Sequence, residues 1–93
     1  MPIDETADPG EALVFPVQFD LRIIYLAEAD ATVEADAVKI LLASGIRFSD
    51  ARRLPTDSAK YRRLAIPVTF ENRASMHAVY AALGKLPYIK AVM

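Results

Sequence analysis

Six basic side chains gather within residues 47–63 and form the strongest candidate for a binding surface. They are Arg47, Arg52, Arg53, Lys60, Arg62 and Arg63. A basic hairpin of this kind can meet a phosphate group or an acidic protein surface. Charge on an edge strand also discourages pairing with other chains, so a purely solvating role is the competing interpretation. If the chain has a partner-binding surface, we expect these six residues to form it.

The sequence offers little for catalysis or metal binding. His77 is the only histidine, and the chain contains no cysteine. A catalytic histidine needs a nucleophile and an orienting acid, and no motif supplies them. The carboxylates of Glu28, Asp30, Glu34 and Asp36 surround a predicted helix start, where acidic groups complement the helix dipole. We therefore predict no enzymatic activity, no catalytic or metal site and no cofactor.

Two stretches of alternating hydrophobicity must position the basic residues. In the first, apolar side chains occupy every second position, whereas Gln18, Asp20 and Arg22 occupy the positions between; the apolar members are Phe15, Val17, Phe19, Leu21, Ile23 and Tyr25. Residues 61–71 repeat this period of two. Such alternation predicts strands with one buried face and one wet face. Pro67 interrupts the second strand, where we expect a bulge or an outward-pointing position because proline cannot donate to a ladder.

Two amphipathic helices complete the pattern. The predicted helices cover about residues 33–44 and 73–83, and the predicted strands cover about 14–26, 47–54, 61–71 and 88–93. Thr32 and Asn72 are the expected N-caps. Gly45 and Gly84 are expected to end the two helices. On the second helix the buried stripe is predicted to contain Met76, Val79, Tyr80 and Leu83.

This order predicts an α+β fold of the ferredoxin-like βαββαβ type. It is a two-layer sandwich, with a four-stranded antiparallel sheet and both helices on one face. The first and third strands should be central because they are the most apolar. The open sheet face is predicted to carry Gln18, Asp20, Arg22, Arg63, Ala65, Pro67 and Thr69. Because the aromatic residues fall on the covered parity, RNA recognition by base stacking is disfavoured.

Composition and charge favour one domain with an acidic extension. The 93 residues have a formal net charge of −1, but residues 1–12 carry four acids and no base. We predict an acidic tail at 1–12 and a single domain at 13–93, whose body is mildly basic. No apolar run is long enough for a membrane span. Absence of cysteine is compatible with the cytoplasm, which is the expected location.

The chain resembles the YbeD-like family of small bacterial proteins of unknown function over about residues 15–93. The resemblance is carried by Phe15-Pro16, by Arg22-Ile23-Ile24 and most strongly by Val79-Tyr80-Ala81-Ala82-Leu83-Gly84-Lys85-Leu86 and Ile89-Lys90-Ala91-Val92-Met93. The hairpin departs from the family, because Thr56-Asp57-Ser58-Ala59-Lys60-Tyr61 stands where Ser-Ser-Lys-Gly-Asn-Tyr is usual. The resemblance implies a ferredoxin-like domain, similar in shape to the ACT-type regulatory domains that bind amino acids. It implies no catalytic residue.

Three functions follow as hypotheses. The first is a non-enzymatic regulatory or adapter protein that acts by protein contact, through the basic hairpin or the open sheet face. The second is an ACT-like sensor of a small ligand such as an amino acid. The third is an accessory protein that binds anions or nucleic acid, which the charge pattern disfavours. A protein partner is expected, and a homodimer or a small-molecule effector stays open.

Overall fold

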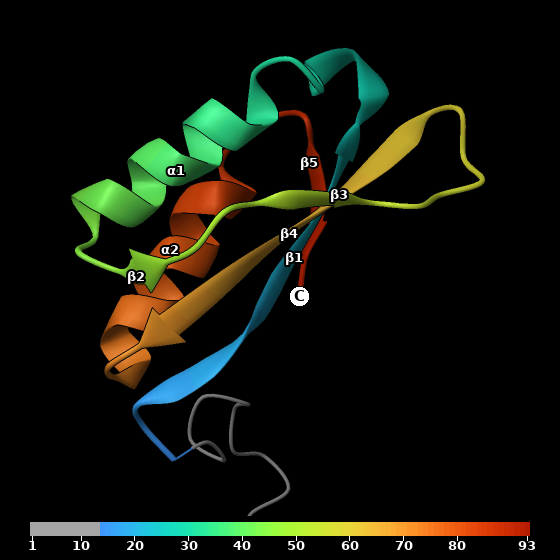
Figure 1. Cartoon of the computed structure of the whole chain (residues 1–93). Helices are drawn as coiled ribbons and strands as arrows, with labels where there is room; N and C mark the ends of the chain where they lie inside the picture. The colour runs from blue at the N-terminus through green and yellow to red at the C-terminus, as the bar shows by residue number, and fades with distance from the viewer. Residues whose placement is uncertain (1–13) are drawn as a thin grey trace, which may run out of the picture.

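The computed structural model describes residues 14–93 and confirms the predicted ferredoxin-like arrangement. In chain order the elements are β1 (Val17–Leu26), the 3₁₀ helix η1 (Ala27–Ala29), α1 (Val33–Ala43), β2 (Arg47–Phe48), β3 (Arg52–Leu54), β4 (Tyr61–Phe70), α2 (Arg73–Gly84) and β5 (Ile89–Val92). Both helices lie on the same side of the sheet, and the other face is open (Figure 1). The acidic tail predicted for residues 1–12 lies outside the described residues, and the domain boundary at residue 13 stays a prediction.

The sheet is built around the long central pair of β1 and β4, as the alternation predicts. Its order is β2–β4–β1–β5, with β3 also paired to β4. The two central strands are antiparallel and in unbroken register from Val17 opposite Phe70 to Leu26 opposite Tyr61. β1 begins at Val17 rather than at residue 14, because Pro16 has no N–H to donate to the ladder. The short strands β2, β3 and β5 flank this central pair.

The predicted edge strand at 47–54 is divided into β2 and β3, so the sheet has five strands rather than four. The division lies opposite Pro67, which stays in register with Asp20 on β1. The carbonyl of Pro67 accepts a hydrogen bond from the N–H of Ser49, so its nitrogen faces the same edge. Because that nitrogen cannot donate, the neighbouring strand loses its pairing until Arg52 meets Ala65. Of the two expectations for Pro67, the outward-pointing position is the one found, on the open face opposite Asp20, and the irregularity lies at residues 49–51 of the neighbouring segment.

The core fills the space between the sheet and the two helices. Its largest fully buried side chains are Tyr25, Phe70, Leu21, Ile23, Leu41, Leu64, Ile66, Leu83, Val33, Val68 and Val79. The β1 and β4 members come from the parity that the sequence assigns to the covered face. On α2 the buried residues include Met76, Val79 and Leu83, whereas Tyr80 is half-buried and its ring lies 6.4 Å from that of Phe70. The predicted stripe is correct in three of its four members.

The helix ends agree only in part with the predicted caps. The side chain of Asn72 accepts a hydrogen bond from the Ser75 N–H at 2.8 Å, as an N-cap should. Thr32 was predicted for the same role on α1, and this was wrong, because its hydroxyl instead donates to the Ala29 carbonyl at 3.4 Å. Gly45 follows α1 with a φ of 69°, the left-handed conformation expected there. Gly84 is the last residue of α2 and does not have a positive φ.

The different caps predict different costs of removal. Asn72→Ala should lower the free energy of unfolding by about 1 kcal/mol, because α2 loses a partner for one of its first amide groups. Thr32→Ala is the matched control. It should lower the free energy of unfolding by only a few tenths of the amount lost in Asn72→Ala, since no cap bond is lost. Urea unfolding followed by circular dichroism measures both. Equal losses in the two variants would contradict the capping role of Asn72.

Candidate functional site

The open face of the sheet combines arginines with apolar side chains. The strand registers place on it Gln18, Asp20, Arg22, Ile24, Leu26, Arg47, Arg52, Leu54, Tyr61, Arg63, Ala65, Pro67, Thr69, Ala91 and Met93. Sequence reasoning missed Ile24, Leu26, Leu54 and Tyr61. The alternation itself could have revealed the first two, because they share the parity of Asp20 and Arg22. The open face is therefore less polar than the sequence analysis predicts.

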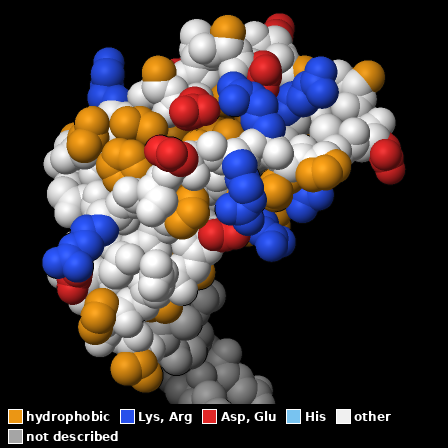
Figure 2. Space-filling view, in the orientation of Figure 1, with side chains coloured by type: hydrophobic (Ala, Val, Ile, Leu, Met, Phe, Trp, Pro, Cys, Tyr) orange, Lys and Arg blue, Asp and Glu red, His pale blue; other side chains and the backbone are white. Residues whose placement is uncertain are grey.

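Cross-strand neighbours on the open face alternate between arginine and apolar residues. One row runs Leu54, Arg63, Ile24, Ala91, and the next runs Arg52, Ala65, Arg22. Ala65 is fully buried although no helix covers it, and the two longer side chains that flank it in its row are both arginine. The aliphatic stems of arginine readily cover apolar surface while the charged heads stay in water. Figure 2 shows Lys and Arg side chains gathered over β3 and β4, with apolar side chains between them.

Charge on the open face is mainly positive. Among the described residues of this face, Asp20 is the only carboxylate side chain, and it lies 2.6 Å from the guanidinium of Arg52. Arg22 and Arg63 form no ion pair within 4.0 Å with any described residue. Surface pairs of this kind contribute little to stability, about 0–1 kcal/mol. The two free guanidinium groups remain available for a carboxylate on another molecule.

The six predicted basic residues do not form one surface. Arg47, Arg52 and Arg63 lie on the open face, whereas Arg53 and Arg62 lie on the covered side of the sheet. Lys60 precedes β4 at the hairpin, with its ammonium group 5.5 Å from the centre of the Tyr61 ring. Arg47 is more exposed than Arg52 and Arg53, and it only approaches Glu71, at 3.9 Å. Neighbouring strand residues point to opposite faces, and this separates Arg52 from Arg53.

Arg53 is held within the fold by the turn between β1 and α1. Its guanidinium donates to the Asp30 carboxylate at 2.9 Å and to the Asp30 carbonyl at 2.8 Å, and it approaches Glu34 at 3.4 Å. The fully buried Tyr25 donates its hydroxyl to the same Asp30 oxygen at 2.6 Å. The hydrogen bonds from Tyr25 and Arg53 lower the pKa of Asp30. The hydrogen bond to Asp30 raises the pKa of Arg53. This cluster fastens the turn to β3.

Three of the four acidic residues around the start of α1 have partners elsewhere in the fold. Asp30 and Glu34 meet Arg53, and Asp36 accepts a hydrogen bond from the Tyr88 hydroxyl at 2.5 Å. Glu28 is exposed on η1. Within residues 14–93, no group of three or more His, Cys, Asp and Glu side chains is arranged to hold a metal ion. His77 is exposed on α2.

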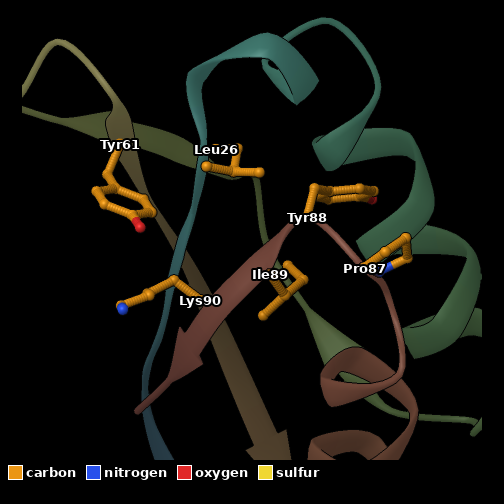
Figure 3. A pocket seen from close by; sticks show the side chains of 6 residues that line it. All are labelled: Leu26, Tyr61, Pro87, Tyr88, Ile89 and Lys90. Carbon is orange, nitrogen blue, oxygen red and sulfur yellow. The ribbon is translucent and has the colours of Figure 1, made fainter.

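Shallow hollows surround the end of β1, and all of them include Leu26. One of about 120 Å³ is lined by Leu26, Tyr61, Pro87, Tyr88, Ile89 and Lys90 (Figure 3). The others lie beside η1: one also contains Lys60 and Glu28, and one contains Glu28, Thr32 and Tyr88. All are open to solvent.

The sequence pattern of the family described as "Protein of unknown function (DUF493)" matches residues 11–93. The chain belongs to this family. It is the YbeD-like family, so the resemblance carried by residues 15–93 is confirmed. No curated protein matches the chain. The family is described as one of unknown function, so membership does not assign an activity to the chain.

Solved structures that resemble the chain confirm its fold. The solution structure of protein HP0495 from H. pylori has a TM-score of 0.71 at 15% identity, covering 100% of this chain and 94% of that one. The C-terminal domain of the MgtC protein from Mycobacterium tuberculosis has a TM-score of 0.70 at 20% identity, covering 95% and 89%. A second solution structure of HP0495, described as a hypothetical protein, has a TM-score of 0.58 at 15% identity and covers both chains completely. At these identities the likeness shows a shared fold.

No helix within the described residues is long and apolar enough to cross a membrane.

Proposed function

We propose that this protein is a non-enzymatic regulatory or adapter domain that binds an acidic surface of a partner protein through its open sheet face. The observation that carries the proposal is the alternation of arginine and apolar residues across three strands. Arginine is favoured at protein interfaces because its guanidinium forms paired hydrogen bonds with carboxylates. The apolar residues between the arginines supply surface that is removed from water on binding. The expected partner surface presents carboxylates around a small apolar centre.

Charge complementarity favours a different protein over a second copy of this chain. Among the described residues, the open face carries arginines on four strands and a single carboxylate side chain, which is already paired with Arg52. Two such faces brought together would oppose like charges, which is costly at an interface. A homodimer through this face is therefore the less favoured outcome.

The cytoplasmic location expected from the sequence stays part of the proposal, supported by the absence of cysteine.

Reversing two unpaired charges should separate binding from folding. In Arg22→Glu with Arg63→Glu, neither side chain loses a described ion pair, so the melting temperature should change little. Affinity for the partner should fall at least tenfold, because both arginines would face carboxylates with like charge. The tagged protein is used to isolate the partner from native extract. The affinity of the purified partner for the wild type and for the double variant is then measured by titration calorimetry.

The matched control reverses two charges on the helical side. Lys39→Glu with Lys85→Glu changes the net charge equally, and both residues are exposed. This control should bind like the wild type. Unchanged partner affinity in the Arg22 and Arg63 variant, or equal loss in both variants, would refute the open face as the interface. A protein that elutes as a dimer, and dissociates in the arginine variant, would replace the partner with a second copy.

A small-ligand sensor is the second candidate, and the hollows around Leu26 favour it. They adjoin the turn between β1 and α1, where an amino-acid site is expected for an ACT-like domain. The turn contains no glycine that would let a ligand approach the backbone closely. A ligand that binds only the folded state raises the melting temperature. A rise with one free amino acid and not with others would favour the sensor over the adapter.

A further inference from the structure

Two lysines converge on one aromatic ring at the end of the sheet. The ammonium groups of Lys60 and Lys90 each lie 5.5 Å from the centre of the Tyr61 ring, within reach of a cation–π interaction. They come from separate segments of the chain, since Lys60 precedes β4 and Lys90 lies in β5. Both therefore lie within twice that distance of each other. An anion that contacts both ammonium groups would be attracted by two positive charges rather than one.

Neither lysine has an acidic partner in the described part of the chain. The ion pairs of residues 14–93 involve Arg47, Arg52 and Arg53, and no lysine. Glu28 lines an adjoining hollow with Lys60, but the two form no ion pair within 4.0 Å. The positive charge at this point is thus not neutralised by the described fold itself.

Hydrogen bonds to the backbone hold the segments that carry the ring and both lysines. The Ser58 hydroxyl oxygen accepts hydrogen bonds from the N–H groups of Lys60 and Tyr61, at 3.2 and 3.0 Å. The Lys60 carbonyl accepts from the Ala27 N–H, and the Tyr88 carbonyl accepts from the Leu26 N–H. These bonds tie the hairpin and the start of β5 to the end of β1. A site that is formed before binding loses less entropy when a ligand arrives.

Apolar side chains form part of the wall of the hollow beside the ring. Figure 3 shows Tyr61 and Lys90 next to one another across the strands, with Leu26, Ile89 and Pro87 on the remaining sides. Its volume of about 120 Å³ admits only a small organic group. Lys90 lines this hollow, and Lys60 lines the adjoining one, which shares Leu26 with it. A ligand that fits has its charged head between the two hollows and a short apolar body against Leu26 and Ile89.

We propose that Lys60, Tyr61 and Lys90 form a binding site for a small phosphate monoester. Two ammonium groups match the charge of −1.5 to −2 that a phosphate monoester carries near neutral pH. Lysine binds phosphate well as a point charge, without the planar geometry that arginine requires. Tyr61 and Leu26 also lie on the open face, but this site depends on neither Arg22 nor Arg63, the two arginines whose reversal tests the proposed function.

Phenyl phosphate is a suitable probe because it joins the charged head to a compact apolar ring. Titration followed by two-dimensional NMR should produce saturable shifts in the amide signals of Lys60, Tyr61, Ile89 and Lys90, with a dissociation constant of about 1 mM or lower. Inorganic phosphate should bind more weakly at the same signals, because it leaves the apolar wall uncovered. Benzyl alcohol, which lacks the charge, should produce no saturable shift.

Removing the two charges tests the assignment directly. Lys60→Met with Lys90→Met keeps the length of both side chains and should weaken phenyl phosphate binding at least tenfold. The control, Lys39→Met with Lys85→Met, should bind within about twofold of the wild type. The Arg22→Glu and Arg63→Glu variant should also keep the site, which separates this proposal from the proposed function.

Several outcomes would overturn the proposal. These are the absence of saturable shifts, shifts centred elsewhere, or unchanged affinity in the Lys60 and Lys90 variant. Equal binding of phenylacetate would mean that a single negative charge suffices, and the site would then not be one for phosphate monoesters. Equal binding of benzyl alcohol would mean that the hollow recognises only the apolar body.

Discussion

Phe70→Ala is expected to lower the free energy of unfolding by about 3–5 kcal/mol, the usual cost of deleting a large buried aromatic side chain. Phe70 is fully buried at the end of β4, opposite Val17 of β1. Its ring lies 5.7 Å from that of Phe19 and 6.4 Å from that of Tyr80, so three elements meet at this side chain. A domain of this size has a total stability of roughly 5–14 kcal/mol. The substitution therefore removes a large share of it.

Urea unfolding followed by circular dichroism gives this loss directly. Phe70→Leu is the matched control, since it keeps an apolar side chain and leaves a smaller cavity. It should cost less than half as much as Phe70→Ala. A loss below about 1 kcal/mol for Phe70→Ala would show that the space beside α2 collapses easily, and that the packing described for this part of the core is wrong.

Stability should also decrease at high pH because of Tyr25. Burial, followed by the hydrogen bond to Asp30, raises the pKa of Tyr25 from 10.0 to about 12. The folded state therefore holds this proton more tightly than the unfolded state does. The resulting stabilisation is fully present below pH 10 and is lost as the pH rises towards about 12. One pKa unit corresponds to about 1.36 kcal/mol, so the loss is about 2–3 kcal/mol.

Tyr25→Phe is the variant that isolates this effect. At neutral pH it should cost about 1.5–3 kcal/mol, because a hydrogen bond to a charged acceptor is removed. Its stability should then decline less steeply than that of the wild type above pH 10. Tyr88 adds to the alkaline loss in both proteins, since burial and its bond to Asp36 raise its pKa as well. Parallel pH profiles of urea midpoints for wild type and variant would contradict the role given to Tyr25.

Local pattern was sufficient for the long elements. The alternation in β1 and β4 identified both central strands and their buried faces, and the 3.6-residue spacing identified both helices. Asn72 and Gly45 were recognisable because capping depends on residue types close in sequence. These features are determined within one element, where a single sequence contains the relevant information.

Features that depend on contacts between elements were predicted less well. The division of the edge strand arises from Pro67, which lies far along the chain from the residues whose pairing it interrupts. Thr32 makes no cap bond because its backbone, with φ −117° and ψ −18°, lacks the extended conformation of an N-cap after η1, which the sequence analysis did not predict. The approach of Lys90 to Tyr61 requires knowledge of how β5 pairs with β1, including the bulge at Lys90.

The basic residues illustrate both situations. Strand geometry alone could have separated Arg52 from Arg53, because neighbours in a strand face opposite ways. Only the structure shows that Arg53 is occupied by Asp30 and Glu34, whereas Arg63 forms no described ion pair. A count of charges along a hairpin therefore overestimates the positive surface that is available to a partner.

The interruption opposite Pro67 has a consequence for how this domain can associate with others. It leaves β2 with two residues and β3 with three, and the other outer strand, β5, has only four. A foreign strand that joins a sheet edge is held mainly by main-chain hydrogen bonds, which are nearly the same for every sequence. Edges this short offer few of them. Association is thus left to the side chains on the faces, where a few substitutions can change the choice of partner while the backbone stays the same.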